Sequence, residues 1–324
     1  MRRFACLLLA IGAAACGSSS GGGSSGPAQV DGVTLMAGFD PGPAPSSDAG
    51  FQIVLPIVKN IAAGASDEYC SWTNIILDHD VWLKESVGFQ SETGHHIIIY
   101  YTMTPAPAGQ SRLCTDADMV SFRFGVGAGG EGVAEDNKLP GDLAVHIPKG
   151  AQLVINHHYL NASAKPVAEA QSAVSVYYAA KNAKITQTSS LAFVDSSMTL
   201  PPGNAVVDYT CTMKADTEIW EILPHMHYYG THINVDLVSA SATKRLFDLD
   251  WTPDYMFHPP ITTMDPSTPD TLHQGDQLKI HCEYNNTTGS TLDFGQEMCV
   301  VYSQTVDPNM VGNMECDQGQ WGSF

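Results

Sequence analysis

The sequence predicts an all-β protein with the strand pattern of β-sandwiches or barrels. Short apolar runs rich in β-branched and aromatic residues, such as "HHIIIYYTM" and "AQLVINHHYL", alternate with turn signals such as "IPKG" and "LPPG". No segment carries a long 3.6-residue periodicity, which argues against a helical fold. The chain has 324 residues, of which 44% are hydrophobic. This is enough apolar material for two domains of about 150 residues each.

The polar stretch "AKNAKITQTSS" marks the expected boundary between the two domains. We place the first domain at residues 34–183 and the second at residues 184–318, followed by a loose tail at residues 319–324. No repeat is evident in the sequence. However, "IPKG" and "LPPG" each precede a strand-like segment in their own half, so two similar sandwiches are expected.

The N-terminus has the features of an export signal in residues 1–15. Arg2 and Arg3 precede a short apolar run that is too short to span a bilayer. The run ends in "AAAC", which is similar to a bacterial lipobox and makes Cys16 the candidate lipidation site. The Gly/Ser-rich residues 16–33 are then a flexible tether. We expect an exported lipoprotein at the outer membrane or cell surface that meets the membrane only through this anchor, with ordinary secretion as the alternative.

The charge of the chain limits its partners. Its formal net charge is -19, and it has only 15 lysines and arginines. Such a surface repels the phosphate backbone of nucleic acids and anionic lipid headgroups. We therefore expect no nucleic-acid partner.

Six cysteines remain once Cys6 in the signal and Cys16 are set aside. An even number of cysteines in an oxidising compartment predicts three disulfides, although fifteen pairings are possible from the sequence alone. No two cysteines form a CxxC pair, so a cysteine-rich zinc site is not expected. The six are Cys70, Cys114, Cys211, Cys282, Cys299 and Cys316.

The stretch "LPHMHYYG" places His225 and His227 two residues apart. On a strand, such residues point to the same face about 6.6 Å apart and can bind one metal ion together. Met226 then points to the opposite face, towards the core. A pair of ordinary histidines on a polar face is the alternative, which two further histidine pairs in the same chain make less attractive.

Those further pairs, His95 with His96 and His157 with His158, consist of neighbours in the sequence. On a regular strand, neighbouring side chains face opposite sides. Both members of a pair can therefore bind one ion only if the backbone is distorted, or if one ring uses Nδ1 and the other Nε2. His157 and His158 are not expected to serve the same site, and the role of His157 stays open.

Met298, in "GQEMCVVY", is a candidate third ligand for the HxH pair. A thioether is a soft and neutral donor that suits Cu(I) and adds little to a zinc site. Taken alone, a methionine in an apolar strand is usually part of the core.

The ordered set of motifs resembles the copper type II, ascorbate-dependent monooxygenases, the family of the peptidylglycine alpha-hydroxylating and dopamine beta-monooxygenases. The resemblance runs from about Ser66 to about Cys316. It implies two antiparallel, jelly-roll-like β-sandwich domains, with one copper site in each facing an open cleft between them. It also implies two ligand sets, one made of His95, His96 and His158 and the other, catalytic, made of His225, His227 and Met298.

The resemblance further implies the disulfides Cys70–Cys114, Cys211–Cys316 and Cys282–Cys299, and a substrate-side role for Tyr302. Two positions depart from the family. Leu223 stands where an amidating enzyme has an arginine, and Val300 replaces an asparagine. A glycine-extended peptide is therefore not the expected substrate, and the substrate stays unidentified as a small organic molecule or a peptide.

The expected function is hydroxylation of a C–H bond with O2, two copper ions per chain and an external reductant, which the resemblance suggests is ascorbate. Incorporation of one oxygen atom from O2 consumes two electrons, and each copper ion supplies one. A copper-binding lipoprotein without activity is the alternative, followed by a zinc protein. The zinc-protease motif HExxH and the hydrolase motif GxSxG are absent from the sequence.

Overall fold

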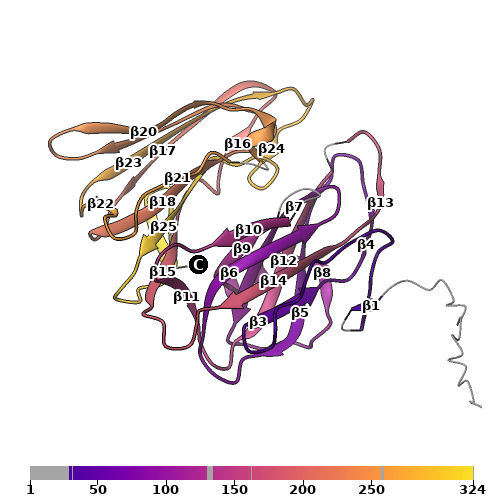
Figure 1. Ribbon diagram of the computed structural model, residues 1–324. Coiled ribbons are helices and arrows are strands. Elements are labelled where there is room, and N and C mark those ends of the chain that lie inside the picture. The colour runs from indigo at the N-terminus through magenta and orange to yellow at the C-terminus, as the bar shows by residue number, and fades with distance from the viewer. Residues whose placement is uncertain (1–28, 31, 130–133, 162, 257–258, 324) are drawn as a thin grey trace, which may run out of the picture.

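The computed structural model describes residues 29–30, 32–129, 134–161, 163–256 and 259–323 (Figure 1). The predicted signal segment, Cys16 and most of the predicted tether lie outside these residues. The end of the tether region contains β1 (Gln29–Val30) and β2 (Val33–Thr34), which pair with each other. The described residues are almost all in strands and loops, as the prediction of an all-β fold requires. They contain no helix that is long and apolar enough to cross a membrane.

Two packed sheets form the first half of the chain. Their apolar side chains alternate inward and meet in a common core that includes Leu83, Ile97, Leu153 and Val174. One sheet has the order β8 (Ser111–Leu113), β5 (Ser66–Ile76), β12 (Gln152–Leu160), β7 (Gly94–Thr102), β9 (Arg123–Ala128). The facing strands are β3 (Gly50–Val54), β14 (Ser172–Tyr178), β6 (Val81–Gln90), β10 (Ala134–Lys138) and β11 (Leu143–Ile147), and the accessory elements are β4 (Val58–Ile61), β13 (Val167–Ala170) and α1 (Asp116–Ser121).

The second half is a second sandwich with its own core, which includes Phe193, Met226, Ile233 and Ile280. Its outer sheet has the order β17 (Gly203–Thr212), β23 (Gln277–Asn286), β19 (Gly230–Val238), β20 (Thr243–Asp250). The facing strands are β18 (Thr217–His225), β25 (Val300–Val306), β15 (Thr186–Val194), β26 (Met314–Asp317), β27 (Gln320–Ser323), β21 (Thr262–Thr263) and β22 (Asp270–Leu272), and the accessory elements are β16 (Thr199–Leu200), β24 (Leu292–Asp293) and η1 (Pro253–Met256).

One sheet runs through both halves, a continuity that the sequence analysis did not anticipate. Strands β11 and β15 pair in parallel, with Leu143 opposite Thr186 and Ala144 opposite Gln187, and this pairing joins twelve strands into a single sheet (Figure 1). The predicted domain boundary at 183/184 falls in the loop between β14 and β15. The buried Trp220 packs with Leu143 across the junction. The two sandwiches are therefore coupled through backbone hydrogen bonds as well as through side chains.

The C-terminal residues differ from the expected loose tail. Residues Gln320–Ser323 form β27, which pairs antiparallel with β26. Trp321 donates a hydrogen bond from Nε1 to the carbonyl of Thr212 at 2.8 Å, and its ring lies edge-on to Phe193. A large aromatic ring that packs on the core and satisfies its N–H group holds this end of the chain in place.

Three disulfides connect the strands: Cys70–Cys114, Cys211–Cys316 and Cys282–Cys299. These are the three pairs that the family resemblance implies, and each stays within one half of the chain. Disulfides persist in oxidising compartments and are rare in the cytosol. They indicate that the protein works in an oxidising, extracytoplasmic environment.

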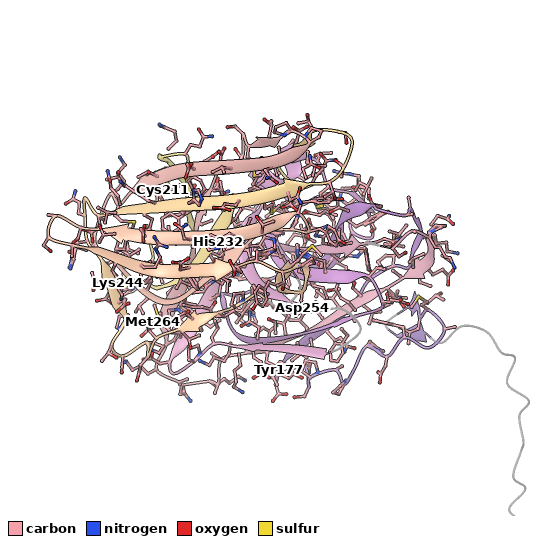
Figure 2. All side chains as sticks on the ribbon, turned by 90° about the horizontal axis from the view of Figure 1, so that it is seen from above. Tyr177, Cys211, His232, Lys244, Asp254 and Met264 are labelled. Atoms are coloured by element: carbon pink, nitrogen blue, oxygen red, sulfur yellow. A yellow bond between two sulfur atoms is a disulfide. The ribbon has the colours of Figure 1, made fainter. Side chains whose placement is uncertain are left out.

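The outer face of the four-stranded sheet carries contacts between histidines and exposed carboxylates. His232, labelled in Figure 2, lies 3.0 Å from Asp250 and 3.1 Å from Asp248, and His281 lies 2.7 Å from Asp208. Exposed pairs of this kind contribute little to stability. Both histidines are partly exposed and lie outside the three histidine pairs that the sequence analysis singled out.

The two halves contain a repeated segment that the sequence analysis missed. Residues 150–163 ("GAQLVINHHYLNAS") correspond to residues 275–288 ("GDQLKIHCEYNNTT") at a constant offset of 125, as from Gly150 to Gly275. Both glycines have a left-handed backbone, with φ of 87° and 92°, a conformation that favours glycine. They precede the corresponding strands β12 and β23. Corresponding buried apolar residues, such as Leu153 and Leu278, identify the repeat more clearly than the overall sequence identity of the two segments does.

The repeat ends in the same hydrogen-bonded turn in both halves. Asn161 accepts hydrogen bonds from the backbone N–H and hydroxyl of Ser163 and donates to three carbonyls. Asn286 accepts from the same two groups of Thr288 and donates to the carbonyls of Leu200 and Ser290. Asn161 is fully buried and Asn286 is 1% exposed. These side chains satisfy backbone groups that would otherwise be buried without partners.

The substitution Asn286→Ala should lower the free energy of unfolding by roughly 1–3 kcal/mol, because it leaves buried carbonyl groups unpaired. Chemical denaturation monitored by tryptophan fluorescence measures this loss. The neighbouring Asn285 is exposed, so Asn285→Ala is the matched control and should change stability by less than about 0.5 kcal/mol. Equal effects of the two substitutions would contradict the structural role of the turn.

Candidate metal centre

Five histidines from both halves of the chain converge into one buried cluster. His95 is the central member, and its ring centroid lies 4.7 Å from that of His158 and 5.8 Å from that of His227. Two groups of three have ligand atoms within 4.8 Å of one another: His95 with His96 and His158, and His95 with His225 and His227. All five were predicted as ligands. The structure joins into one cluster the two sets that were expected to be separate.

A β-bulge explains how the neighbours His95 and His96 reach the same cluster. Opposite them on β12, His158 pairs with His96, but Tyr159 pairs with Gly94, so one extra residue is inserted at His95. A bulge turns the extra side chain away from its regular direction. The Nδ1 atoms of His95 and His96 lie 2.7 Å apart as a result. This is the backbone distortion that the sequence analysis gave as one of two ways for both residues to bind one ion.

His158 completes the first group from the neighbouring strand. Directly paired residues in an antiparallel sheet have adjacent side chains, and the ring centroids of His96 and His158 are 4.9 Å apart. The Nε2 atom of His158 shares a 2.8 Å hydrogen bond with the Ser66 hydroxyl. Its Nδ1 atom is buried and has no hydrogen-bond partner among the described residues. Such an unpaired buried nitrogen is costly by itself and fits a metal ligand.

The HxH pair lies where β18 ends. His225 is the last residue of the strand, Met226 is fully buried in the core of the second half, and His227 follows in the loop. The ring centroids of His225 and His227 are 5.0 Å apart. A side chain at Gly230 would place its Cβ 2.8 Å from Met226 and 2.9 Å from Trp251. The glycine after the motif therefore allows the loop to pack closely enough to turn His227 towards its partner.

Glu297 holds this loop in place, a role that the sequence analysis missed. The carboxylate is fully buried. It accepts backbone hydrogen bonds from His227 at 3.0 Å, Tyr229 at 2.5 Å and Met298 at 3.3 Å. Burial raises the pKa of Glu297 to about 7, while these three N–H donors favour its charged form. An acidic residue beside Met298 and Cys299 in an otherwise apolar segment was the signal available in the sequence.

Tyr302 lies beside the HxH pair, and Met298 belongs to the same apolar cluster as Tyr302. Strand β25 pairs with β18 so that Val300 is opposite His225, and Tyr302 is opposite Leu223. Met298 and Tyr302 pack against the same small cluster of Ala192, Val194 and Val300. The ring centroid of Tyr302 is 6.2 Å from that of His225. The structure therefore brings the predicted phenol next to His225, whereas the role of the Met298 thioether as a ligand stays a prediction.

His157 faces away from the cluster, in keeping with the prediction that it does not share a site with His158. Its Nε2 atom lies 3.0 Å from the hydroxyl of Ser71, and its Nδ1 atom lies 3.2 Å from the hydroxyl of Tyr159. Both ring nitrogens therefore have partners within the first half. Burial lowers the pKa of His157 to about 3, so it is a neutral structural residue.

The environment keeps the five clustered imidazoles neutral. Burial is the main cause that lowers the pKa of each of them, and the neighbouring rings lower the pKa of His95 and His158 further. The pKa of His227 falls to about 4. A neutral imidazole has the free lone pair that a metal ligand needs. The cluster is thus a set of ready nitrogen donors at neutral pH.

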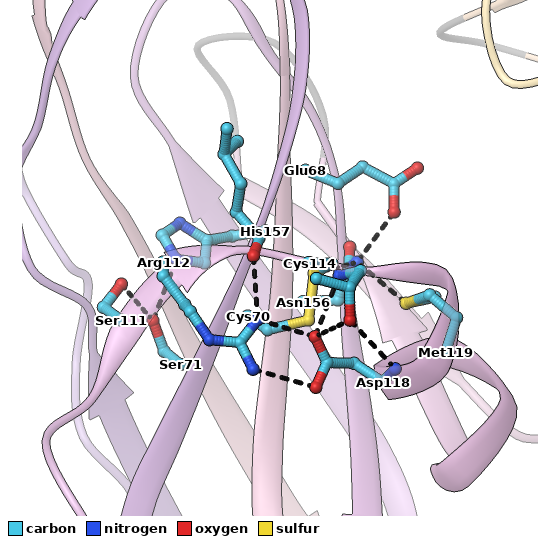
Figure 3. Close-up of a disulfide and its surroundings, with 12 residues drawn as sticks. Glu68, Cys70, Ser71, Ser111, Arg112, Cys114, Asp118, Met119, Asn156 and His157 are labelled. Carbon is cyan, nitrogen blue, oxygen red and sulfur yellow. Dashed lines mark hydrogen bonds and ion pairs between the residues drawn. A yellow bond between two sulfur atoms is a disulfide. The ribbon is translucent and has the colours of Figure 1, made fainter.

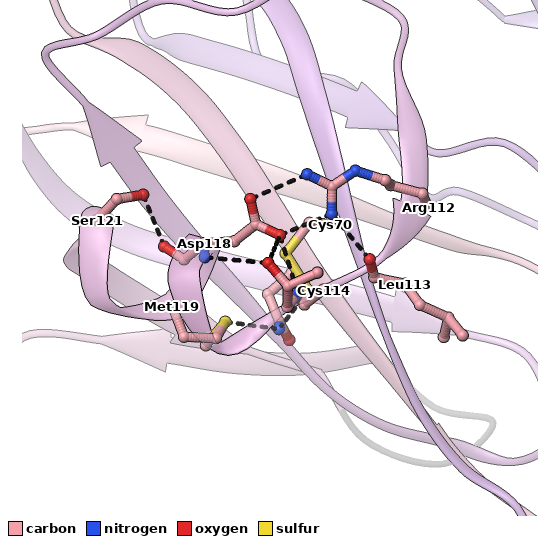
Figure 4. Close-up of polar contacts among 9 residues, drawn as sticks. Cys70, Arg112, Leu113, Cys114, Asp118, Met119 and Ser121 are labelled. Atoms are coloured by element: carbon pink, nitrogen blue, oxygen red, sulfur yellow. Dashed lines mark hydrogen bonds and ion pairs between the residues drawn. A yellow bond between two sulfur atoms is a disulfide. The ribbon is translucent and has the colours of Figure 1, made fainter.

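The Cys70–Cys114 disulfide stiffens the strands behind the first group (Figure 3). Asn156, on the same strand as His158, donates to the Glu68 carboxylate at 2.9 Å. The Glu68 charge favours the protonated form of His96, which opposes the effect of burial on its pKa. Arg112 and Asp118 form an ion pair with N–O distances of 2.6 and 2.9 Å beside the disulfide (Figure 4). These contacts support the strands from which His96 and His158 project.

The expected open cleft is largely closed in this structure: three of the five histidines are buried, whereas His96 and His225 are half-buried. His95 is 5% exposed, His158 is 1% exposed and His227 is 3% exposed. Helix η1 reaches across from the second half, and the carbonyl of Met256 lies 3.1 Å from His95 Nε2. Two described cavities lie elsewhere: one of about 460 Å³ on the outer sheet of the second half, and one of about 210 Å³ between the halves, lined in part by Arg123 and Asn313.

Comparison with known proteins identifies no relative. No family model matches the sequence, and no curated protein is significantly similar to it. The major capsid protein P2 from bacteriophage PM2 matches 79% of this chain and 96% of its own length, with 12% identity and a TM-score of 0.36. PNGase F, a glycosylasparaginase from Flavobacterium meningosepticum, matches 80% of this chain and 96% of its own length, with 11% identity and a TM-score of 0.34. TM-scores this low carry no argument about function.

The metal-free protein should lose stability as the pH falls below 6.5. Histidines in the unfolded chain take up protons near pH 6.5, whereas His227 stays neutral in the folded state down to about pH 4 and His157 down to about pH 3. Within that window, each such histidine lowers the free energy of unfolding by roughly 1.4 kcal/mol per pH unit. Above pH 6.5 these groups are neutral in both states and add no pH dependence.

Urea denaturation between pH 7.5 and 5 measures this slope. His157→Gln should reduce the slope, whereas the same substitution at His79, whose side chain is 71% exposed, should leave it unchanged. Identical slopes for the wild-type protein and His157→Gln would show that burial of His157 does not control the acid sensitivity.

Glu297→Ala should destabilise the protein by at least about 2 kcal/mol and weaken metal binding, because it leaves three buried N–H groups without an acceptor. Glu297→Gln keeps the shape of the side chain but turns its amide N–H₂ group towards these donors. We therefore expect it also to lower stability and weaken metal binding. Glu92→Ala removes an exposed carboxylate and is the matched control. Denaturation curves and metal titrations give both readouts. If the Glu297→Ala protein folds and binds metal with wild-type affinity, Glu297 does not position the loop that carries His227.

Proposed function

We propose that this protein is an exported copper-dependent monooxygenase that hydroxylates a C–H bond. The observation that carries the proposal is the convergence of five histidines with lowered pKa values from two sandwiches, with Tyr302 beside His225 and Met298 in the same apolar cluster as Tyr302. The resemblance of the ordered motifs to copper type II, ascorbate-dependent monooxygenases supports the same function. The proposal includes lipid attachment at Cys16, placement at the outer membrane or cell surface, and ascorbate as the reductant.

The donors fit copper better than the alternatives. Imidazole nitrogen suits both zinc and copper, whereas a thioether favours Cu(I). The unpaired Nδ1 of His158 gives the first group an available ligand atom. His227 Nδ1 lies 3.2 Å from the carbonyl of Gln296, so the N–H of this ring is on Nδ1. The lone pair of Nε2 is then free to bind a metal ion. When bound, the two copper ions would each supply one electron and activate O2 for insertion of one oxygen atom into the substrate.

The protein's own residues would orient the reaction and exclude water. His95, His96 and His158 would hold one ion, and His225 and His227, with Met298, would hold the ion nearest to the substrate. Glu297 would fix the loop and Met298 through their backbone N–H groups. Burial raises the pKa of the Tyr302 hydroxyl, so it stays protonated and could donate a hydrogen bond to a substrate oxygen. The half-buried Leu223 opposite it favours an apolar substrate portion over a carboxylate.

A copper-binding protein without catalytic activity is the second candidate, because three of the five histidines are buried and the other two are only half-exposed in this structure. Turnover requires the substrate to reach them, and η1 is the element that covers His95. Storage or transfer of copper would require the ion alone to enter. The two candidates agree on the metal and differ in oxygen consumption.

Metal analysis of untagged protein, reloaded under air, should give two copper ions per chain. Met298→Ala should lower ascorbate-dependent oxygen uptake by roughly tenfold or more while the protein stays folded. Met103 is 56% exposed, so Met103→Ala is the control and should behave as wild type. One zinc and no copper would refute the proposed metal, and unchanged uptake by Met298→Ala would remove the thioether from the mechanism.

The substrate can be sought with ¹⁸O₂. Loaded protein and ascorbate are incubated with an extract of the source organism, and mass spectrometry identifies products that carry one labelled oxygen atom. Label that appears with wild type and not with Met298→Ala supports monooxygenation. Copper binding without labelled product or oxygen uptake would favour the non-catalytic candidate.

A further inference from the structure

We infer that His95 is a ligand common to both histidine groups, so that two bound metal ions form a close pair within one centre. This inference rests on the proposed function for the identity of the metal. It departs from the expectation of two separate sites, one in each sandwich. The sharing of one side chain makes the centre a property of both halves together.

The positions of the rings support this sharing. His95 lies on β7 of the first half, yet its ring centroid is 5.9 Å from that of His225 and 5.8 Å from that of His227 in the second half. These distances are only about 1 Å longer than its 4.8 Å separation from its neighbour His96. Removal of His95 would leave each group with two histidines instead of three. Among the described residues, neither group therefore contains three histidines without His95.

The two nitrogens of His95 face different halves of the molecule. Nδ1 lies 2.7 Å from Nδ1 of His96, within the first half. Nε2 lies 3.1 Å from the carbonyl of Met256, which belongs to η1 in the second half. One ring therefore contacts groups from both halves. If His95 held an ion through each nitrogen, its ring N–H proton would pass to the buffer and its contact with the Met256 carbonyl would be lost.

The bulge at His95 makes this arrangement possible. On a regular β7, His95 would point with Ile97 and Ile99 into the core of the first half. The inserted residue turns the ring out of that core and towards the second half. The Glu297 carboxylate fixes the opposite side, because it accepts the backbone N–H of His227. Backbone structure therefore holds both His95 and His227 in position.

Electron paramagnetic resonance of the full chain tests the inference without any measurement of activity. Protein loaded with two equivalents of Cu(II) should show a spectrum broadened by spin–spin interaction, with a half-field transition. Protein with one equivalent should show an isolated Cu(II) signal. Two bound ions whose spectrum is the sum of two isolated signals would overturn the inference, and so would a limit of one ion per chain.

Substitutions distinguish a shared ligand from two separate sites. His95→Gln should weaken binding of both ions, whereas His96→Gln should weaken only one, as measured by competitive titration with a chelator. A loss confined to one ion in His95→Gln would contradict sharing. Circular dichroism verifies that each variant is folded, and the wild-type spectrum decides the matter if His95→Gln does not fold. A spin-coupled Cu(II) pair in a protein that takes up no oxygen would support His95 as a shared ligand. The same result would contradict the proposed monooxygenase function.

Discussion

The parallel pairing of β11 with β15 is the interaction on which the position of the metal centre depends. It joins the two sandwiches into one sheet. Strand β15 pairs with β25, and β25 pairs with β18, which ends at His225. On the other side, β11 belongs to the sheet that packs on β7 and β12. The pairing therefore brings the histidines of β7 and β12 to the end of β18, although His158 and His225 are 67 positions apart in the sequence.

Burial of five neutral imidazoles at this junction has to be compensated. Polar side chains without partners are costly in a low-dielectric interior, and the surrounding contacts meet part of that cost. Ser66 bonds His158, the Met256 carbonyl contacts His95, and the Gln296 carbonyl contacts His227. The buried Nδ1 atom of His158 has no hydrogen-bond partner among the described residues. A bound metal ion would satisfy this atom and would stabilise the folded protein.

The internal repeat shows how similar scaffolds came to serve different roles. Strands β12 and β23 share the glycine turn, the buried Leu and Ile positions, the tyrosine and the asparagine turn. At the offset of 125, His157 corresponds to Cys282 and His158 to Glu283. In the second half these positions carry a disulfide and an exposed carboxylate. The second half instead supplies its histidines from the end of β18, so the ligands are not repeated although the fold is.

The sequence by itself determined the strand-rich fold and the domain boundary to within a loop, because alternation and turn residues are local signals. HxH spacing singled out His225 and His227, whereas the family resemblance supplied the set of His95, His96 and His158. The sequence left two ways for His95 and His96 to act together, a distorted strand or the use of different ring nitrogens. Only the tertiary structure decided that this distortion is a bulge, that one sheet crosses both halves, and that Glu297 anchors the ligand loop. Those features arise from pairing between strands that are distant in the chain. Strand register has no local signature, and the acidic residue beside Met298 did not reveal from which N–H groups its carboxylate would accept hydrogen bonds. The same physical reason explains why two separate sites were expected and one joined cluster was found.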